Sequence, residues 1–331
     1  MFCLELAGDE DGFAVCEADA AASAIDRVAP GLATARGIDS DRIRTLAYTH
    51  AASELVARCE PELAAAELAI EAATFDRAGS VAVRARDVRG STGVSTQAAE
   101  RRLGAVLVDR GFTVDLDDPD HELRVLFSQG PVGDDQRAVC LIGWLAAESR
   151  RDFGDRRPTD RPFFQPGSMD PLDARALVNI AGAKPGARIV DPMCGTGGLL
   201  LEAGLVGSEV VGVDAQWKMT RGSKENLTAL LGDGFEILHG DATALALADD
   251  CADAVVFDAP YGRQSKIARH ELADLVGGAL SEARRIAPRA VVVADRSWEK
   301  EARDAGWTVD RRFERRVHGT LVRHVHVLSA E

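Results

Sequence analysis

The chain has 331 residues, enough for two domains of ordinary size, and its 46% hydrophobic content excludes a disordered protein. It contains no apolar run of about 18 residues, which argues against a membrane span, and its acidic N-terminus disfavours a signal peptide, so we expect a cytoplasmic protein. The formal net charge of −14 is unusual for a nucleic-acid binder, which typically presents a basic surface.

The first 148 residues mix predicted helices and strands. In chain order we expect a strand at residues 2–6, helices at 19–28 and 49–59, a strand at 80–86, a helix at 96–109 and a strand at 122–127. An acidic Asp-Asp-Pro-Asp turn at 117–120 precedes the last strand. This half carries no glycine-rich strand–turn–helix motif.

Residues 149–161 are charged and poor in aliphatic side chains, which is typical of a linker. Their arginines are candidates for contacts with nucleic-acid phosphates, but a solvated linker explains them equally well. Both interpretations stay open for positions 150, 151, 156, 157 and 161.

After residue 161 short apolar strands alternate with helices, which predicts an α/β domain with a doubly wound parallel sheet. We expect strands at residues 188–190, 209–213, 236–238, 254–257 and 290–294, with helices at 197–205, 219–231 and 272–286. Residues 307–317 and 321–328, joined by a His318-Gly319-Thr320 turn, predict an antiparallel hairpin that closes one sheet edge.

A glycine turn between the first strand and helix of this domain predicts a ligand site. It reads Asp191-Pro-Met-Cys194-Gly195-Thr196-Gly197, and its glycines let backbone N–H groups approach a ligand at a helix N-terminus. The third glycine of a dinucleotide fingerprint is missing, and an acid opening the turn suits a ligand with a cationic amine. Both points favour S-adenosyl-L-methionine over NAD.

Two further acids follow later strands of the same domain. Asp214 ends the next strand, where a carboxylate can accept the hydroxyls of a ribose. Asp241 ends the third strand, where it can accept from an adenine amino group. We therefore expect both acids to bind the cofactor.

The tetrad Asp258-Ala259-Pro260-Tyr261 ends the fourth strand and predicts methylation of an exocyclic amine. The Asp258 carboxylate and the Ala259 carbonyl can accept the two N–H hydrogens of such an amine, which turns its lone pair towards the methyl donor. Tyr261 offers a ring for stacking of the base, and Pro260 fixes the turn. A base in a duplex hides its amine, so we expect it to flip into the pocket.

Other residue patterns carry less information. Six scattered cysteines and seven histidines show no metal-ligand spacing, so we expect neither a metal nor disulfides. Five lysines against 34 arginines, with many acids, resemble proteins of salt-accumulating archaea, although a GC-rich genome also produces this bias. Trp217 and Lys218 either flank the adenine or serve helix packing.

These motifs together resemble the archaeal tRNA (guanine-10-N2)-methyltransferase family, over nearly the whole chain. The similarity is sharpest in residues 161–171 (RPFFQPGSMDP), 191–198, 258–263 (DAPYGR) and 316–323 (RVHGTLVR). The resemblance implies a Rossmann-like methyltransferase domain, a cofactor pocket walled in part by Phe164, Pro166 and Ser168, and tRNA as the partner. It implies one or two methyl groups on N2 of guanosine 10.

The N-terminal half resembles a ferredoxin-like segment followed by a THUMP domain, which in this family grips the tRNA. We therefore expect an RNA-binding region at residues 1–148, a linker at 149–161 and a methyltransferase domain at 162–331, and we favour a monomer. The family usually has two prolines after the acid, and Ala259 replaces the first.

Three alternatives remain at this stage. The tetrad does not separate guanine N2 from adenine N6, so another tRNA guanosine such as position 6, or an adenine, is a possible target. A catalytically silent RNA-binding protein would explain Ala259, but intact Asp191, Asp214, Asp258 and Tyr261 argue against it. An NAD-dependent oxidoreductase is disfavoured by the missing glycine.

Overall fold

The computed structural model describes residues 1–261, 269–318 and 321–330. Gly262 and Arg263, which follow the tetrad, and Gly319 and Thr320 of the expected hairpin turn lie outside the described residues. The chain forms two compact units, Met1–Arg150 and Arg151–Glu331. Within the described residues, no helix has the length and apolar character that crossing a membrane requires.

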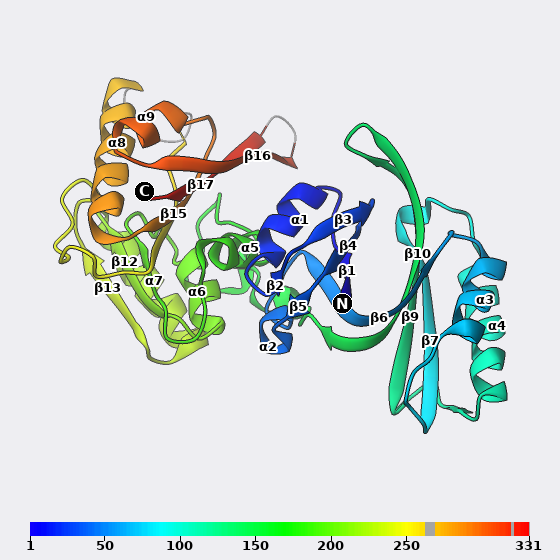
Figure 1. Cartoon of the computed structure of the whole chain (residues 1–331). Helices are drawn as coiled ribbons and strands as arrows, with labels where there is room; N and C mark the ends of the chain where they lie inside the picture. The colour runs from blue at the N-terminus through cyan, green and yellow to red at the C-terminus, as the bar shows by residue number, and fades with distance from the viewer. Residues whose placement is uncertain (262–268, 319–320, 331) are drawn as a thin grey trace. The chain divides into compact units, whose positions relative to one another are not determined.

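Unit 1 is built on one eight-stranded sheet, in the order β3-β4-β1-β6-β10-β9-β7-β8. Figure 1 shows the long strand β10 running through this unit. Its strands are β1 (Phe2–Leu6), β3 (Asp26–Ala29), β4 (Leu32–Ala35), β6 (Thr49–Cys59), β7 (Ser80–Asp87), β8 (Thr113–Val114), β9 (His121–Val132) and β10 (Asp135–Glu148). β2 (Ala22–Ser23) and β5 (Gly37–Ile38) form a separate pair.

The helices of unit 1 pack against this sheet. They are α1 (Asp11–Ala18), α2 (Ser40–Ile43), α3 (Leu63–Ala72) and α4 (Thr96–Asp109), with a 3₁₀ turn at Val88–Gly90. In Figure 1, α3 and α4 lie side by side next to β7. Leu103 and Leu107 of α4 share a buried core with Phe127 and Trp144. The apolar face of α4 therefore explains why its predicted bounds agree with the structure.

Two helix predictions in unit 1, at residues 19–28 and 49–59, were wrong. Residues 19–28 follow α1 and enter β2 and β3, and residues 49–59 form β6. β6 pairs with β1 on one side and β10 on the other, so both of its edges are hydrogen-bonded. Its alanines favour a helix locally, but pairing on both sides overrides that preference.

Unit 2 contains a seven-stranded sheet in the order β13-β12-β11-β14-β15-β17-β16. The first five are parallel, and β17 pairs antiparallel with β15 and β16. The strands are β11 (Arg188–Asp191), β12 (Glu209–Asp214), β13 (Phe235–His239), β14 (Ala254–Asp258), β15 (Arg289–Ala294), β16 (Thr308–His318) and β17 (Leu321–Ser329). The expected Rossmann-like sheet with an antiparallel closing hairpin is confirmed.

In the described part of unit 2 the sheet is accompanied by the helices α5 (Pro171–Ala181), α6 (Gly198–Leu205), α7 (Trp217–Leu231), α8 (Arg269–Ile286) and α9 (Glu299–Asp304). Val276 and Leu280 of α8 pack with Phe257 and Val292 of the sheet in one buried cluster. This core holds the central strands in register, so it fixes the positions of the residues at their ends.

The segment expected as a linker is partly packed into unit 2. It forms short 3₁₀ turns at Asp152–Arg156 and Pro158–Asp160. The buried Arg156 guanidinium donates to both carboxylate oxygens of Glu202, at 2.7 and 3.0 Å, and Arg175 pairs with the same carboxylate at 2.8 Å. Arg161 is also buried. Arg156 and Arg161 therefore belong to the interior and not to a solvated linker.

Candidate active site

Three acids meet at the carboxyl ends of the central parallel strands of unit 2. Asp191 ends β11, Asp214 ends β12 and Asp258 ends β14. In register, Asp191 lies beside Gly212 and Asp258 beside Val293. Ligands of open α/β sheets bind at this edge, outside the carboxyl ends of the strands.

The glycine turn between β11 and α6 has the conformation that its residues predict. Gly195 and Gly197 have φ values of +53° and +78°, in the left-handed region that favours glycine. A Cβ atom on Gly197 would lie 2.5 Å from Ser223 Oγ and 2.6 Å from Leu227 Cδ1. The turn therefore lies so close to α7 that a side chain at position 197 does not fit.

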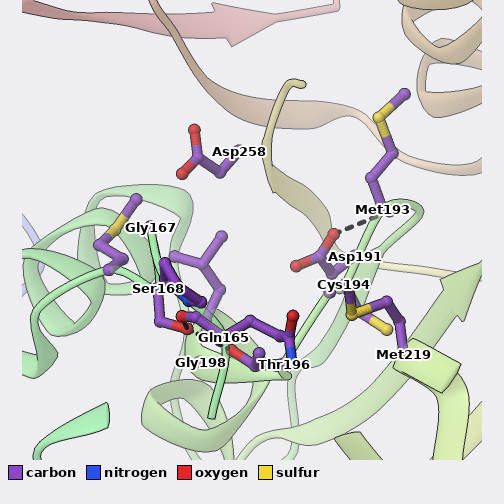
Figure 2. Close-up of a pocket in the computed structure, with 14 residues that line it drawn as sticks. Gln165, Gly167, Ser168, Asp191, Met193, Cys194, Thr196, Gly198, Met219 and Asp258 are labelled. Carbon is purple, nitrogen blue, oxygen red and sulfur yellow. Dashed lines mark hydrogen bonds between the residues drawn. The ribbon is translucent and has the colours of Figure 1, made fainter. Parts of the chain in front are cut away.

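A cavity of about 200 Å³ lies in front of this turn. Figure 2 shows that the Asp191 and Asp258 carboxylates both border it, with Ser168 and Thr196 further along its wall. Its lining residues are Gln165, Pro166, Gly167, Ser168, Met169, Asp191, Met193, Cys194, Gly195, Thr196, Gly198, Leu199, Met219 and Asp258.

The two carboxylates that line this cavity, Asp191 and Asp258, are desolvated by burial. Burial raises the pKa of Asp191 well above its usual range, and the Asp214 and Asp258 charges raise it further, although the Met193 N–H donates to its Oδ1 at 2.9 Å. Burial likewise raises the pKa of Asp258 to about 6. Its Oδ1 is buried without a hydrogen-bond partner within the described residues. The cavity therefore suits a cationic ligand, as S-adenosyl-L-methionine is.

Asp214 and Asp241 occupy different surroundings. Asp214 accepts from the Gly195 N–H at 3.0 Å and the Gln216 N–H at 2.8 Å, which leaves lone pairs for ligand hydroxyls. Asp241 is exposed, and its Oδ1 accepts from both Thr243 N and Thr243 Oγ1 at 2.8 Å. Asp214 thus braces the glycine turn, whereas Asp241 caps its own loop. Neither carboxylate is part of the cavity lining.

Asn226 on α7 holds the segment that walls the cavity, and sequence patterns did not single it out. Its Nδ2 donates to the carbonyls of Phe163 and Thr196, both at 2.9 Å, while its Oδ1 accepts from Phe163 N at 2.8 Å. Ser168 Oγ lies 3.1 Å from Thr196 Oγ1. Pro166 and Ser168 line the cavity, whereas Phe164 is 42% exposed and lies outside the lining. Buried amides of this kind have no sequence signature.

The tetrad adopts a turn that adds one bond to the sheet. The Ala259 N–H donates to the Val293 carbonyl at 2.8 Å, and Ala259 is buried. Pro260 and Tyr261 are partly buried.

A second unpredicted group supports Tyr261. The buried Arg323 of β17 donates through Nε to Tyr261 Oη at 3.2 Å and pairs with Asp173 at 3.4 Å. Arg315 of β16 pairs with the other Asp173 oxygen at 2.9 Å. Arg323 also opposes the rise in the pKa of Asp258 through its charge. The closing hairpin therefore brings a fixed cation to the tetrad.

The described residues lack a side-chain grouping of the kind that binds metal ions. Across residues 1–261, 269–318 and 321–330, no group of three or more His, Cys, Asp and Glu side chains is arranged to hold an ion. The six cysteines are free thiols.

Comparison with known proteins agrees with this geometry. The model of the RMKL-like methyltransferase domain matches residues 158–324. The chain is 37% identical to a tRNA (guanine(10)-N2)-dimethyltransferase of Methanothermobacter thermautotrophicus, over 86% of this chain and 84% of the relative. It is 30% identical to the Pyrococcus abyssi protein of the same description, over 76% and 74%.

A solved structure is similar over the full length. The crystal structure of TrmN from Thermus thermophilus aligns with a TM-score of 0.52 and 24% identity, covering 100% of this chain and 99% of the other. At that identity the likeness shows the fold.

Proposed function

The chain belongs to the family of tRNA (guanine-N2)-methyltransferases with an RMKL-like methyltransferase domain, and we propose that it methylates N2 of guanosine 10 in tRNA. The methyl donor is S-adenosyl-L-methionine. The observation that carries the proposal is Asp258, a carboxylate at the end of β14 that borders the acid-lined cavity. Its buried Oδ1 has no hydrogen-bond partner among the described residues.

Unit 2 supplies side chains suited to the cofactor. Asp191 would hold the cationic amine, Asp214 the ribose hydroxyls, and the turn from Cys194 to Gly197 would present its backbone N–H groups. Pro166 and Ser168 would close the wall opposite. When bound, the cofactor supplies a methyl group activated by the adjacent sulfonium.

The tetrad would act on the base by positioning. Asp258 and the Ala259 carbonyl would accept the two hydrogens of the guanine amine, and Tyr261, held by Arg323, would stack on the ring. A pKa of about 6 keeps Asp258 mostly ionised at neutral pH, so it accepts at that pH. Positioning of this kind requires no strong general base.

The choice of tRNA position depends on the rest of the chain. The relatives that match most of this chain are described as acting at guanosine 10. We assign RNA binding to unit 1, as a ferredoxin-like plus THUMP region. We also propose a monomer that works in the cytoplasm, which size-exclusion chromatography and cell fractionation test.

Mass spectrometry of nucleosides tests the function. Unmodified tRNA transcript incubated with enzyme and isotope-labelled methyl donor should yield labelled N2-methylguanosine or N2,N2-dimethylguanosine at position 10. Label on adenine, or at position 6, would assign the alternative targets instead.

Asp258→Ala tests the mechanism. This variant should lose methyl transfer by about a hundredfold to a thousandfold, because it removes one of two acceptors of the amine. Its affinity for the cofactor, measured by calorimetry, should stay within a few-fold of wild type. Retained turnover would remove Asp258 from the mechanism.

A further inference from the structure

Trp217 is an exposed aromatic side chain at the start of α7, the helix whose Met219 lines the cavity. It is 67% exposed, whereas Trp144, Trp298 and Trp307 are 2%, 6% and 3% exposed. Trp217 begins α7, three residues after Asp214, and Met219 of the same helix turn lines the cavity. A single exposed aromatic side chain is not by itself a site, so what surrounds this ring decides its role.

The Trp217 ring is held in place by His239. The two ring centroids are 4.0 Å apart and the planes differ by 4°, so the rings are stacked. His239 ends β13, and its Nε2 lies 2.9 Å from the Ala215 carbonyl. One face of the indole is therefore backed by a side chain that is itself anchored to the backbone, and the ring forms a firm platform.

Three cations continue this platform along α7. Lys218, Arg221 and Lys224 are exposed and recur at three-residue spacing, which places them on one side of the helix. Arg221 and Lys224 line a shallow groove together with Pro162, Glu225, Thr228 and Ala229. Only five lysines occur in the chain, and two of them are here.

This concentration of positive charge contrasts with the rest of the protein. The chain carries a net charge of −14, whereas the groove and its approach hold three cations and one acid, Glu225. An anionic partner is therefore the one whose charge fits. A ring for stacking combined with a row of cations suits an unpaired nucleotide and the phosphates next to it.

We propose that Trp217, His239, Lys218, Arg221 and Lys224, the α7 surface, contact the substrate tRNA. Trp217 stacks on an unpaired base, and the three cations contact neighbouring phosphates. The assignment rests on the proposed function, because it takes tRNA as the substrate of the adjacent cavity. Binding here guides the RNA towards that cavity.

Substitution of Trp217 tests the platform. Trp217→Ala should raise the Kd for unmodified tRNA transcript about tenfold, within the range that loss of one stacked base produces. Trp217→Phe should bind tRNA nearly as wild type, because a ring remains. Cofactor affinity without tRNA should change less than twofold in both variants. If Trp217→Ala instead lost about tenfold in affinity for the cofactor, the ring would be assigned to the adenine and the proposal would be overturned.

Charge neutralisation tests the cations. The double variant Lys218→Gln/Lys224→Gln should weaken tRNA binding about tenfold at 0.1 M KCl and reduce the slope of log Kd against log salt by about 0.7–0.9 per lost contact. The matched control is Lys184→Gln/Arg289→Gln. It removes the same charge from exposed residues that precede or begin β11 and β15, at the opposite edge of the sheet. Its slope should equal that of wild type.

The outcomes separate the α7 surface from the proposed function. Equal losses of tRNA affinity in both double variants would indicate a general charge effect and would overturn the assignment of the α7 surface. Wild-type tRNA affinity in Trp217→Ala would also overturn it. A wild-type enzyme that binds tRNA but leaves guanosine unmethylated would overturn the proposed function. Selective binding losses in the α7 variants would support the surface even then.

Discussion

Asp258 combines a position suited to catalysis with a cost in stability. Burial raises its pKa from an ordinary value near 3.8 to about 6, so the folded protein binds its proton more tightly than the unfolded chain. Stability therefore falls as pH rises between about 4 and 6, and the full penalty remains above pH 6. Active sites commonly contain such groups, whose charge is unfavourable until the ligand arrives.

Replacement of Asp258 by asparagine should stabilise the folded protein at neutral pH. Asp258→Asn removes the buried charge, so the free energy of unfolding at pH 7.5 should increase by about 1–3 kcal/mol, up to the value of a shift of about two pKa units. Chemical denaturation of both proteins measures it. At pH 4 the two proteins should be nearly equally stable. A variant less stable than wild type at pH 7.5 would contradict a strained carboxylate.

Arg323 affects the same carboxylate through its charge, and the pH dependence of activity should report it. Methyl transfer should rise with pH through about 6 as Asp258 ionises. Arg323→Gln removes a cation that lowers this pKa, so the acidic limb of kcat/KM should move to higher pH. Arg323→Lys keeps the charge and should restore much of the limb. An unchanged limb in Arg323→Gln would leave Arg323 a purely structural role.

Some residues of this site could be predicted from the sequence and others could not. Asp191, Gly195, Gly197 and Asp258 stand where a strand pattern stops, so their places at one sheet edge were predictable. Asn226 and Arg323 were not, because a buried amide on a helix and an arginine in a hairpin strand have no distinguishing spacing. Their roles appear only when α7 and β17 pack against the cavity.

Among the secondary-structure elements, strand pairing explains which predictions from the sequence were right and which were wrong. Unit 2 was predictable because buried parallel strands read as short apolar runs separated by amphipathic helices. β6 was not, because its alanines favour a helix locally and nothing in the local sequence shows that β1 and β10 pair with both of its edges. Long-range hydrogen bonding is invisible to local pattern.

The turn after β14 gives a prediction about its unusual alanine. Proline at 259 would remove the N–H that donates to the Val293 carbonyl, while keeping the carbonyl that the mechanism uses. Ala259→Pro should therefore lower the free energy of unfolding by about 1–2 kcal/mol and change kcat less than about threefold. Thermal unfolding and initial rates measure both. Ala259→Ser keeps the N–H and is the control. Its free energy of unfolding should be closer to that of wild type than the value for Ala259→Pro.

At the scale of the whole molecule, excess negative charge shapes both stability and RNA binding. Fifty-three acids face 39 lysines and arginines, and some acids lie close together, as at Asp115, Asp117 and Asp118. There the Asp115 carboxylate accepts from the N–H groups of the other two at 3.0 and 3.1 Å. Like charges at such spacing repel one another at low salt. Added salt screens this repulsion and also screens the attraction between the α7 surface and phosphates.

Salt should therefore move stability and tRNA affinity in opposite directions. Raising KCl from 0.05 to 0.5 M should increase the Tm by about 5 °C, because the Debye length falls below the spacing of many surface acids. Over the same range tRNA affinity should fall steeply. Scanning calorimetry and fluorescence anisotropy measure the two effects, and sucrose, which leaves charges unscreened, is the control for general stabilisation. A Tm that rises equally in sucrose, or that stays constant in KCl, would show that self-repulsion contributes little to the stability of this chain.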